Sequence, residues 1–205
     1  MNGLRRSLAA VFLIWLCTAA GAAGTEDDRA AAARAVVERL QDALLEAMKT
    51  GSYGARYALL DPVVRETHDL GKIARVALGR SVWKTLSEAE RARYLALFAK
   101  MSVASYARAF KGYSGERFEI VSVQPVRKNG MFVRTRLHKA DGGVVQLDYH
   151  LIRQRDGRWR IVNVVSDGVS DLALKRDQFR DIIQSRGFEA LLAEIESQAR
   201  PHPPR

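Results

Sequence analysis

The sequence predicts an α+β domain in which N- and C-terminal helices cover a curved, four-stranded antiparallel sheet. Three observations support this fold class. Apolar residues recur at helical spacing up to residue 110, alternate every second residue between residues 117 and 161, and return to helical spacing after residue 170. Helices that flank a meander in this way should pack on one face of the sheet.

Helical patterns fill the first part of the chain. We expect an amphipathic helix between residues 26 and 50, with charged residues on its outer face. A second, short helix should run from residue 53 to residue 60. Asp61-Pro62 should interrupt it, because proline removes a backbone donor and clashes with the preceding turn.

Capping residues define later helices. Ser87 and Glu90 form a capping box, which predicts the start of a long helix with a largely aromatic face. Ser170 can cap a further helix, and Gly187 should end it before a last short helix.

Short turns separate the alternating segments of the predicted sheet. They are Lys128-Asn129-Gly130, Asp141-Gly142-Gly143 and Asp156-Gly157. Each is compatible with a hairpin, so consecutive strands should be antiparallel neighbours. The alternation gives this meander one apolar and one charged face.

The N-terminus has the features of a secretory signal peptide. Arg5 and Arg6 precede a short apolar run that ends in small residues. We therefore expect residues 1–22 to be removed on export. Residues 23–200 should form a single domain, and residues 201–205 should be a disordered tail.

The sequence offers few groups for catalysis or metal binding. The single cysteine lies in the expected signal peptide, and the four histidines show no paired-ligand spacing. We therefore predict no metal, no cofactor and no thiol chemistry. Asp148 and His150 are the better acid–base candidates, but alternation places them on the charged face, where we expect them to pair with arginines.

The chain is basic, with a formal net charge of +10. Nucleic-acid binding would need exposed aromatic residues among the basic ones, but here the aromatic residues fall at core spacing, so we expect no nucleic-acid partner. The arginines of the charged sheet face form either a solvated surface or a docking site for acidic proteins or anionic lipids. They are Arg134, Arg136, Arg158 and Arg160.

Several segments are distinctive in combination. They are residues 61–79, Tyr94 to Phe98 running on to Ser105-Tyr106, Val145 to Tyr149, and above all Val165 to Ser170 followed by Arg176 to Phe179. Together they resemble the MlaC/toluene-tolerance family of periplasmic lipid-binding proteins, over roughly residues 36–195. The run from residue 159 to residue 176 is most similar to the hopanoid-biosynthesis-associated branch of that family.

The resemblance implies an NTF2-like α+β fold with an apolar pocket between sheet and helices. It also implies a soluble periplasmic carrier that shuttles phospholipid or hopanoid between the inner and outer membranes. The implied partners are the inner-membrane ABC transporter complex and the outer-membrane lipoprotein complex of an Mla-type system. The alternative is an NTF2-like enzyme of isomerase type acting on an apolar polycyclic substrate, which would need an acid or base inside the pocket, whereas a carrier needs no catalytic residue.

A lipid pocket has to be deep, because exposing two ~16-carbon chains to water would cost roughly 25 kcal/mol. We expect apolar positions of the sheet to face apolar positions of two helices across a space open at one end. The alternative is that the same side chains close into a solid core. In the sheet they are Val133, Leu137, Leu147, Tyr149, Leu151, Trp159 and Ile161, and in the helices they are Phe98, Met101, Tyr106, Phe110, Phe179 and Ile183.

Overall fold

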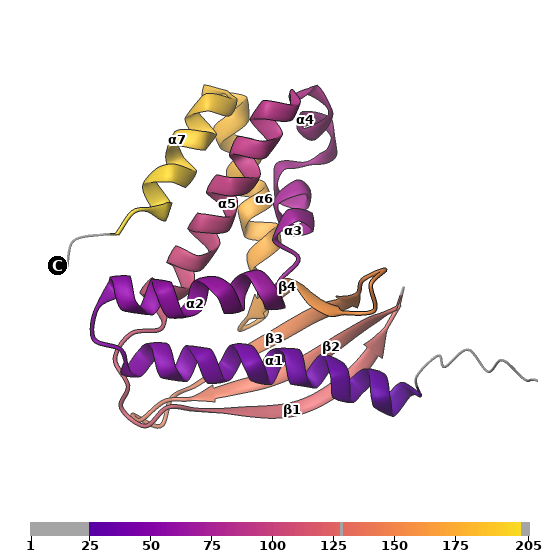
Figure 1. Cartoon of the computed structure of the whole chain (residues 1–205), viewed down its shortest axis with the longest axis vertical. Coiled ribbons are helices and arrows are strands. Elements are labelled where there is room, and N and C mark those ends of the chain that lie inside the picture. The colour runs from indigo at the N-terminus through magenta and orange to yellow at the C-terminus, as the bar shows by residue number, and fades with distance from the viewer. Residues whose placement is uncertain (1–24, 128, 202–205) are drawn as a thin grey trace, which may run out of the picture.

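The computed structural model describes residues 25–127 and 129–201. A group of upright helices stands at one side of an antiparallel sheet, and two further helices lie along the sheet (Figure 1). The elements are α1 Glu26–Lys49, α2 Tyr53–Thr67, α3 Leu70–Leu78, α4 Arg80–Thr85, α5 Glu88–Ala109, β1 Arg117–Val126, β2 Gly130–His138, β3 Val144–Arg153, β4 Trp159–Ser166, β5 Val169–Ser170, α6 Asp171–Arg186 and α7 Phe188–Ala199. The expected signal peptide lies outside the described residues, as does the expected tail beyond Pro201. None of the helices within the described ranges is long and apolar enough to cross a membrane.

Side-chain caps start the helices where the sequence predicts them. Ser87 Oγ accepts a hydrogen bond from the Glu90 N–H at 3.3 Å, and the Glu90 carboxylate accepts one from the Ser87 N–H at 2.7 Å. The predicted capping box at the start of α5 is therefore confirmed. Ser170 caps α6 by accepting from the Ala173 N–H at 3.1 Å, and Gly187, at φ 85°, ends that helix.

The predicted break in the second helix is wrong. α2 continues through Pro62 to Thr67 and ends only at His68. Pro62 and Ala58 both lie on the exposed face of the helix. The Ala58 carbonyl, which Pro62 leaves without its helical donor, can therefore bond to water, and the buried face of α2 maintains the helix across the proline.

The sheet is a meander with the strand order β1-β2-β3-β4-β5, and all neighbouring pairs are antiparallel. The predicted four-stranded sheet is confirmed for β1 to β4, and the two-residue strand β5 extends it. A bulge in β4 shifts the register between the pairs His150–Asn163 and Leu151–Ile161. Beyond this bulge Val164 pairs with Tyr149, so the simple alternation that holds for the first residues of β4 no longer applies.

Buried apolar side chains form two cores. The sheet core lies between α1, α2 and the inner face of the sheet and consists of Ala33, Val37, Leu40, Leu44, Ala47, Leu60, Val64, Val103, Ala107, Met131, Val133, Tyr149, Leu151, Trp159 and Ile161. The helical core lies between α3, α5, α6 and α7 and consists of Ile73, Ala74, Ala77, Leu78, Leu86, Tyr94, Phe98, Met101, Phe179, Leu191, Leu192 and Ile195. α5 contributes its first half to the helical core and its last turns to the sheet core, so it connects the two.

The charged face of the sheet differs from the prediction at Asp148 and His150. Asp148 is only 4% exposed and accepts hydrogen bonds from Gln146 Nε2 at 2.6 Å and from the Thr135 N–H at 3.4 Å, not from an arginine. His150 is half-buried, and its Nε2 has no partner within the described residues. The predicted pairing of these two residues with arginines is therefore wrong.

Substitution of Pro62 by Ala tests how α2 tolerates its proline. We expect the free energy of unfolding to rise by about 1 to 3 kcal/mol, because alanine restores the helical hydrogen bond at an exposed position. Urea denaturation followed by circular dichroism measures the change. Leu40→Ala, in the sheet core, is the opposite control and should lower the free energy by about 2 to 5 kcal/mol. An unchanged or lower stability in Pro62→Ala would contradict this account of the helix.

Candidate functional site

An apolar pocket lies between α3, α5, α6 and β4. Its volume is about 220 Å³. It is lined by His68, Leu70, Ile73, Phe98, Ser102, Ser105, Tyr106, Ala109, Phe110, Asn163, Val164, Ser166, Asp171, Leu172 and Lys175. The pocket therefore lies where the two cores meet, since Phe98 and Ile73 belong to the helical core and Tyr106 and Val164 pack against the sheet core.

One face of α5 forms a wall of this pocket. Phe98, Ser102, Tyr106 and Ala109 follow one another at intervals of three or four residues, so they lie on the same side of the helix. The Ser102 hydroxyl donates to the Phe98 carbonyl oxygen at 2.9 Å, within the helix. This bond satisfies the hydroxyl group locally, so the wall remains mostly apolar.

The junction between α2 and α3 forms the opposite wall and is attached to β4. The Asp69 N–H donates to the Ile161 carbonyl oxygen at 2.9 Å, and His68 forms an isolated parallel bridge with the same strand residue. These contacts place the His68 ring in the pocket. Its Nε2 is 2.9 Å from the Tyr106 hydroxyl oxygen, and the two rings meet edge to face.

The hydrogen bonds around His68 determine its tautomer. The Thr67 hydroxyl donates to the Val63 carbonyl oxygen at 2.7 Å, so it can only accept from His68 Nδ1, which is 3.0 Å away. Nδ1 also lies 3.2 Å from the Val64 carbonyl oxygen, which is an acceptor only. His68 therefore carries its proton on Nδ1, and Nε2 accepts a hydrogen bond from Tyr106.

Burial keeps this pair uncharged. Desolvation lowers the pKa of His68 from 6.5 to about 4, and desolvation raises the pKa of the Tyr106 hydroxyl well above its ordinary value. Near neutral pH the pair is a neutral polar group in an apolar wall. The lone pair of His68 Nε2 is engaged by Tyr106, so the arrangement is suited to orienting a polar atom of a ligand rather than to removing a proton.

Polar residues of α6 and β4 form the rim of the pocket. Asn163 Oδ1 accepts from the Ser170 hydroxyl at 3.0 Å and from the Leu172 N–H at 3.3 Å, which fixes the start of α6 against β4. Lys175 and Asp171 form an ion pair within the first turns of α6, and the Lys175 side chain is only 19% exposed. The rim can therefore meet the polar end of a ligand while the walls meet its apolar part.

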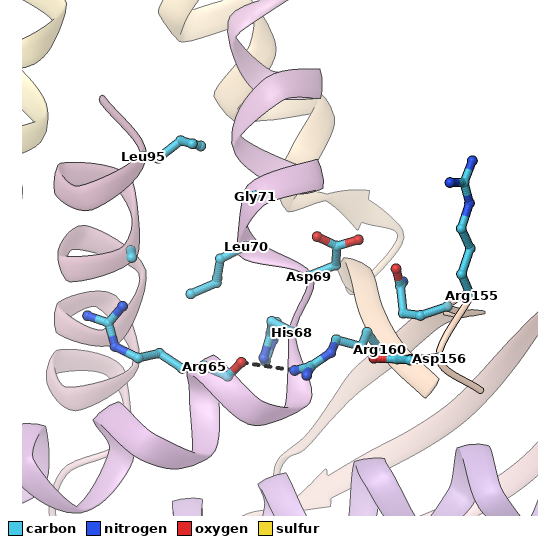
Figure 2. Close-up of a pocket in the computed structure, with 11 residues that line it drawn as sticks. Arg65, His68, Asp69, Leu70, Gly71, Leu95, Arg155, Asp156 and Arg160 are labelled. Atoms are coloured by element: carbon cyan, nitrogen blue, oxygen red, sulfur yellow. Dashed lines mark hydrogen bonds between the residues drawn. The ribbon is translucent and has the colours of Figure 1, made fainter. Parts of the chain in front are cut away.

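A larger, polar cavity of about 670 Å³ lies on the other side of the α2–α3 junction (Figure 2). It is lined by Arg65, His68, Asp69, Leu70, Gly71, Leu95, Ala99, Gln154, Arg155, Asp156 and Arg160. His68 and Leu70 line both this cavity and the apolar pocket. These two residues are therefore the wall that separates them.

Three of the residues predicted to bind lipid line the apolar pocket, namely Phe98, Tyr106 and Phe110. The others lie in packed regions away from its lining: Met101, Val133, Leu137, Leu147, Tyr149, Leu151, Trp159, Ile161, Phe179 and Ile183. The physical reason is that α1 covers the inner sheet face directly, and α3 and α7 cover the helical positions. Their contact with lipid remains a prediction.

The predicted docking arginines do not behave alike. Arg134 and Arg136 are exposed on the outer face, and the Arg134 guanidinium lies 5.8 Å from the centre of the Phe132 ring. Arg158 forms an ion pair with Asp156 at 2.6 Å. Arg160 is different, because it reaches round the edge of the sheet to the C-terminal end of α2.

Arg160 Nη1 donates to the Arg65 carbonyl oxygen at 3.0 Å (Figure 2). It also donates to the Glu66 carbonyl oxygen. These two oxygens are among the last carbonyls of α2, which have no helical donor of their own. A cation is favourable at this end of a helix dipole. Arg160 therefore has a structural role at the end of α2, and its part in docking remains a prediction.

Sequence reasoning missed several lining residues. His68 was considered only as a metal ligand, and Asn163 and Val164 follow the bulge in β4, which alternation does not reveal. Leu70 and Leu172 lie at helical spacing with other apolar residues, in α3 and α6. Their helical spacing was visible, but spacing alone does not distinguish a residue of a pocket from a residue of a core.

A curved antiparallel sheet with helices on its inner face and an apolar pocket at their junction places the chain in the class of NTF2-like α+β folds. The sequence narrows this class further. The MlaC protein family matches residues 34–197, so the chain belongs to the MlaC family. The predicted resemblance is thereby confirmed at the level of the family.

Individual relatives agree with this placement. The intermembrane phospholipid transport system binding protein MlaC of Haemophilus influenzae is 25% identical over 122 residues, which are 58% of this chain and 57% of that protein. The match thus spans less than two thirds of this relative. The phospholipid-binding protein from Ralstonia solanacearum, solved in complex with a phospholipid, has the same fold, with a TM-score of 0.71 and 19% identity over 82% of this chain and 96% of that one. A cyanobacterial iota-carbonic anhydrase, solved with bicarbonate, reaches a TM-score of only 0.41, with 14% identity over 70% of this chain and 91% of that one.

The lowered pKa of His68 predicts a pH-dependent stability. The unfolded chain binds a proton at His68 below about pH 6.5, whereas the folded chain does so only below about pH 4. The contribution of His68 is therefore complete above pH 6.5 and is lost as the pH falls toward 4, by about 3 kcal/mol in total.

Urea denaturation of the wild type and of His68→Gln across this pH range measures the effect. Carboxylates titrate in both proteins, so the difference between the two slopes isolates His68. We expect the wild type to lose stability more steeply than the variant. Parallel slopes would show that His68 is not held neutral in the folded protein.

Proposed function

We propose that this protein is a periplasmic lipid carrier that binds its cargo in the apolar pocket and catalyses no reaction. The observation that carries the proposal is a pocket with mainly apolar walls, formed where two cores meet, in a chain of the MlaC family. The name of the Haemophilus influenzae relative and the phospholipid bound to the Ralstonia solanacearum protein support a phospholipid as cargo.

The size of the pocket implies that it opens when lipid enters. Sites for drug-sized ligands have about 300 to 1,000 Å³, whereas this pocket has about 220 Å³. A two-chain lipid would therefore need more room. The boundary between the sheet core and the helical core is the place where room can be made with the least loss of packing, because contacts within each core remain intact. Leu147 and Ile183, which only flank these cores, would be among the first side chains to join the lining.

The polar groups of the pocket suit a lipid with few polar atoms in its apolar part. Tyr106 and His68 offer one neutral hydrogen-bonding pair, which fits an ester carbonyl of a phospholipid or a hydroxyl group of a hopanoid. The hopanoid alternative rests on the resemblance of residues 159–176 to the hopanoid-associated branch. Extraction of bound lipid from the purified protein and mass spectrometry would distinguish these two cargos.

The isomerase-type alternative would use the same pair as its acid and base. Two observations oppose this alternative. His68 is neutral, and its unprotonated nitrogen, Nε2, already accepts a hydrogen bond from Tyr106. An enzyme of this kind would release product and keep no stoichiometric lipid. Turnover of a small polycyclic substrate by protein that carries no lipid would therefore replace the carrier proposal.

The carrier would exchange lipid with an inner-membrane ABC transporter complex and an outer-membrane lipoprotein complex. Arg134 and Arg136 are suited to this docking, because they are exposed and no ion pair engages either of them within the described residues. A positive surface steers association with acidic partners at rates that fall with salt. Arg158 and Arg160 contribute less, since each already has partners within the protein.

Filling the pocket tests the binding site directly. Ser102→Trp places a large side chain between α5 and the opposite wall, so we expect lipid recovered with the purified protein to fall roughly tenfold. Native mass spectrometry of protein purified from its host measures lipid occupancy. Ala92→Trp, at an exposed position of the same helix, is the matched control and should keep its lipid. Full occupancy in Ser102→Trp would exclude this pocket as the binding site.

Removal of the exposed arginines tests docking. Arg134→Ser/Arg136→Ser should slow association with the purified partner complexes roughly tenfold at low salt, and should leave lipid occupancy unchanged. Arg34→Ser/Arg180→Ser removes the same charge from exposed, ion-paired positions and should have little effect. If both double variants associate at the same rate, these arginines have no docking role.

A further inference from the structure

A basic groove lies far from the sheet, at the outer end of the upright helices. It is a cavity of about 300 Å³ lined by Arg75, Val76, Gly79, Arg80, Trp83 and Arg176. Figure 1 shows α4 at the end of the upright helices that points away from the sheet. Gly79, at φ 85°, both ends α3 and starts α4, so this sharp turn brings residues of the two helices to one place.

The lining of this groove contains three arginines and no acidic residue. Within the described part of the chain, none of the three forms an ion pair, and no hydrogen bond holds the Arg80 or Arg176 side chain. Exposed arginines elsewhere, such as Arg34, Arg93 and Arg180, are paired with carboxylates. Three arginines without an ion pair therefore line one small groove.

Trp83 forms the apolar centre of the groove. The Arg75 guanidinium lies 5.9 Å and the Arg91 guanidinium 5.3 Å from the centre of its ring. Both arginines are also fixed to backbone carbonyls, Arg75 to Gly71 at 3.1 Å and Arg91 to that of Trp83 itself at 3.1 Å. Val76, beside them, is 40% exposed. The groove thus presents an aromatic side chain and an aliphatic one between cations.

We propose that this groove docks the protein onto membranes that contain anionic phospholipids. The arginines would contact the phosphodiester groups, and Trp83 and Val76 would lie at the level of the headgroups. Tryptophan and basic residues are the side chains enriched at membrane–water interfaces. The groove has the volume of about ten water molecules, which admits a headgroup but not a helix of a folded partner, about 10 Å across.

This docking is separate from the binding of lipid in the apolar pocket. The groove shares no lining residue with that pocket or with the polar cavity at the α2–α3 junction. Loss of the cargo in Ser102→Trp should therefore leave membrane docking unchanged. Failure of the carrier proposal and failure of the docking proposal can be told apart by this variant.

Co-sedimentation with vesicles tests the docking proposal. We expect the wild type to bind vesicles of equal parts phosphatidylglycerol and phosphatidylcholine, and to bind pure phosphatidylcholine vesicles much more weakly. Arg75→Ser/Arg80→Ser/Arg176→Ser should lower the partition coefficient by roughly fivefold per arginine, or about a hundredfold in total. Equal binding to both kinds of vesicle would overturn the proposal.

A matched control separates this groove from the general charge of the protein. Arg34→Ser/Arg93→Ser/Arg180→Ser removes the same number of exposed arginines elsewhere, and it should lower binding by no more than a few-fold. Equal losses in the two triple variants would overturn the proposal. If the triple groove variant fails to fold by circular dichroism, Arg80→Glu alone carries the test and should lower the partition coefficient roughly 25-fold.

Free inorganic phosphate carries the same kind of anionic group as a phospholipid headgroup, so it is the other ligand that these arginines would bind. Inorganic phosphate should displace the wild type from anionic vesicles no better than sodium chloride of equal ionic strength, because the proposed site needs the apolar surroundings of a headgroup. Stronger displacement by phosphate would assign the groove to a free anion and overturn membrane docking.

Discussion

The attachment of the α2–α3 junction to β4 is the interaction on which the rest of the structure depends. The backbone hydrogen bond from the Asp69 N–H to the Ile161 carbonyl oxygen holds the junction at the edge of the sheet, together with the His68–Ile161 bridge and the hydrogen bonds of Arg160 to the end of α2. This attachment places His68 Nε2 2.9 Å from the Tyr106 hydroxyl oxygen on α5. It thereby connects α2, α5 and β4 around His68. The wall between the apolar pocket and the polar cavity exists because of this attachment.

The division into two cores explains why a cavity occurs at this place. Protein interiors pack to high density, and space remains where two independently packed units meet. The sheet core and the helical core are joined mainly along α5, and the apolar pocket lies beside that helix at the boundary. A pocket at such a boundary can change its volume while each core remains packed, as the proposed binding of long apolar chains requires.

The net charge of +10 does not show which arginines are available to a partner molecule. That depends on the partners that each arginine already has within the protein. Arg160 is used to satisfy carbonyl oxygens at the end of α2, and Arg158 is neutralised by Asp156. Arg134 and Arg136, on the sheet, and Arg80 and Arg176, near α4, form no ion pair within the described residues. Two separate groups of arginines without an ion pair result, one on β2 and one beside α4.

The sequence by itself determined the α+β class, the helix caps at Ser87 and Ser170, and the antiparallel meander, because caps, turns and alternation are local properties of the chain. It also identified the family through segments spread over the whole domain. Only the tertiary structure decided that α2 continues through Pro62, that a bulge turns Val164 toward the pocket, and that Val133, Tyr149 and Ile161 are covered by α1. These outcomes depend on which distant element covers each face, and periodicity is the same for a residue in a core and a residue on a cavity wall.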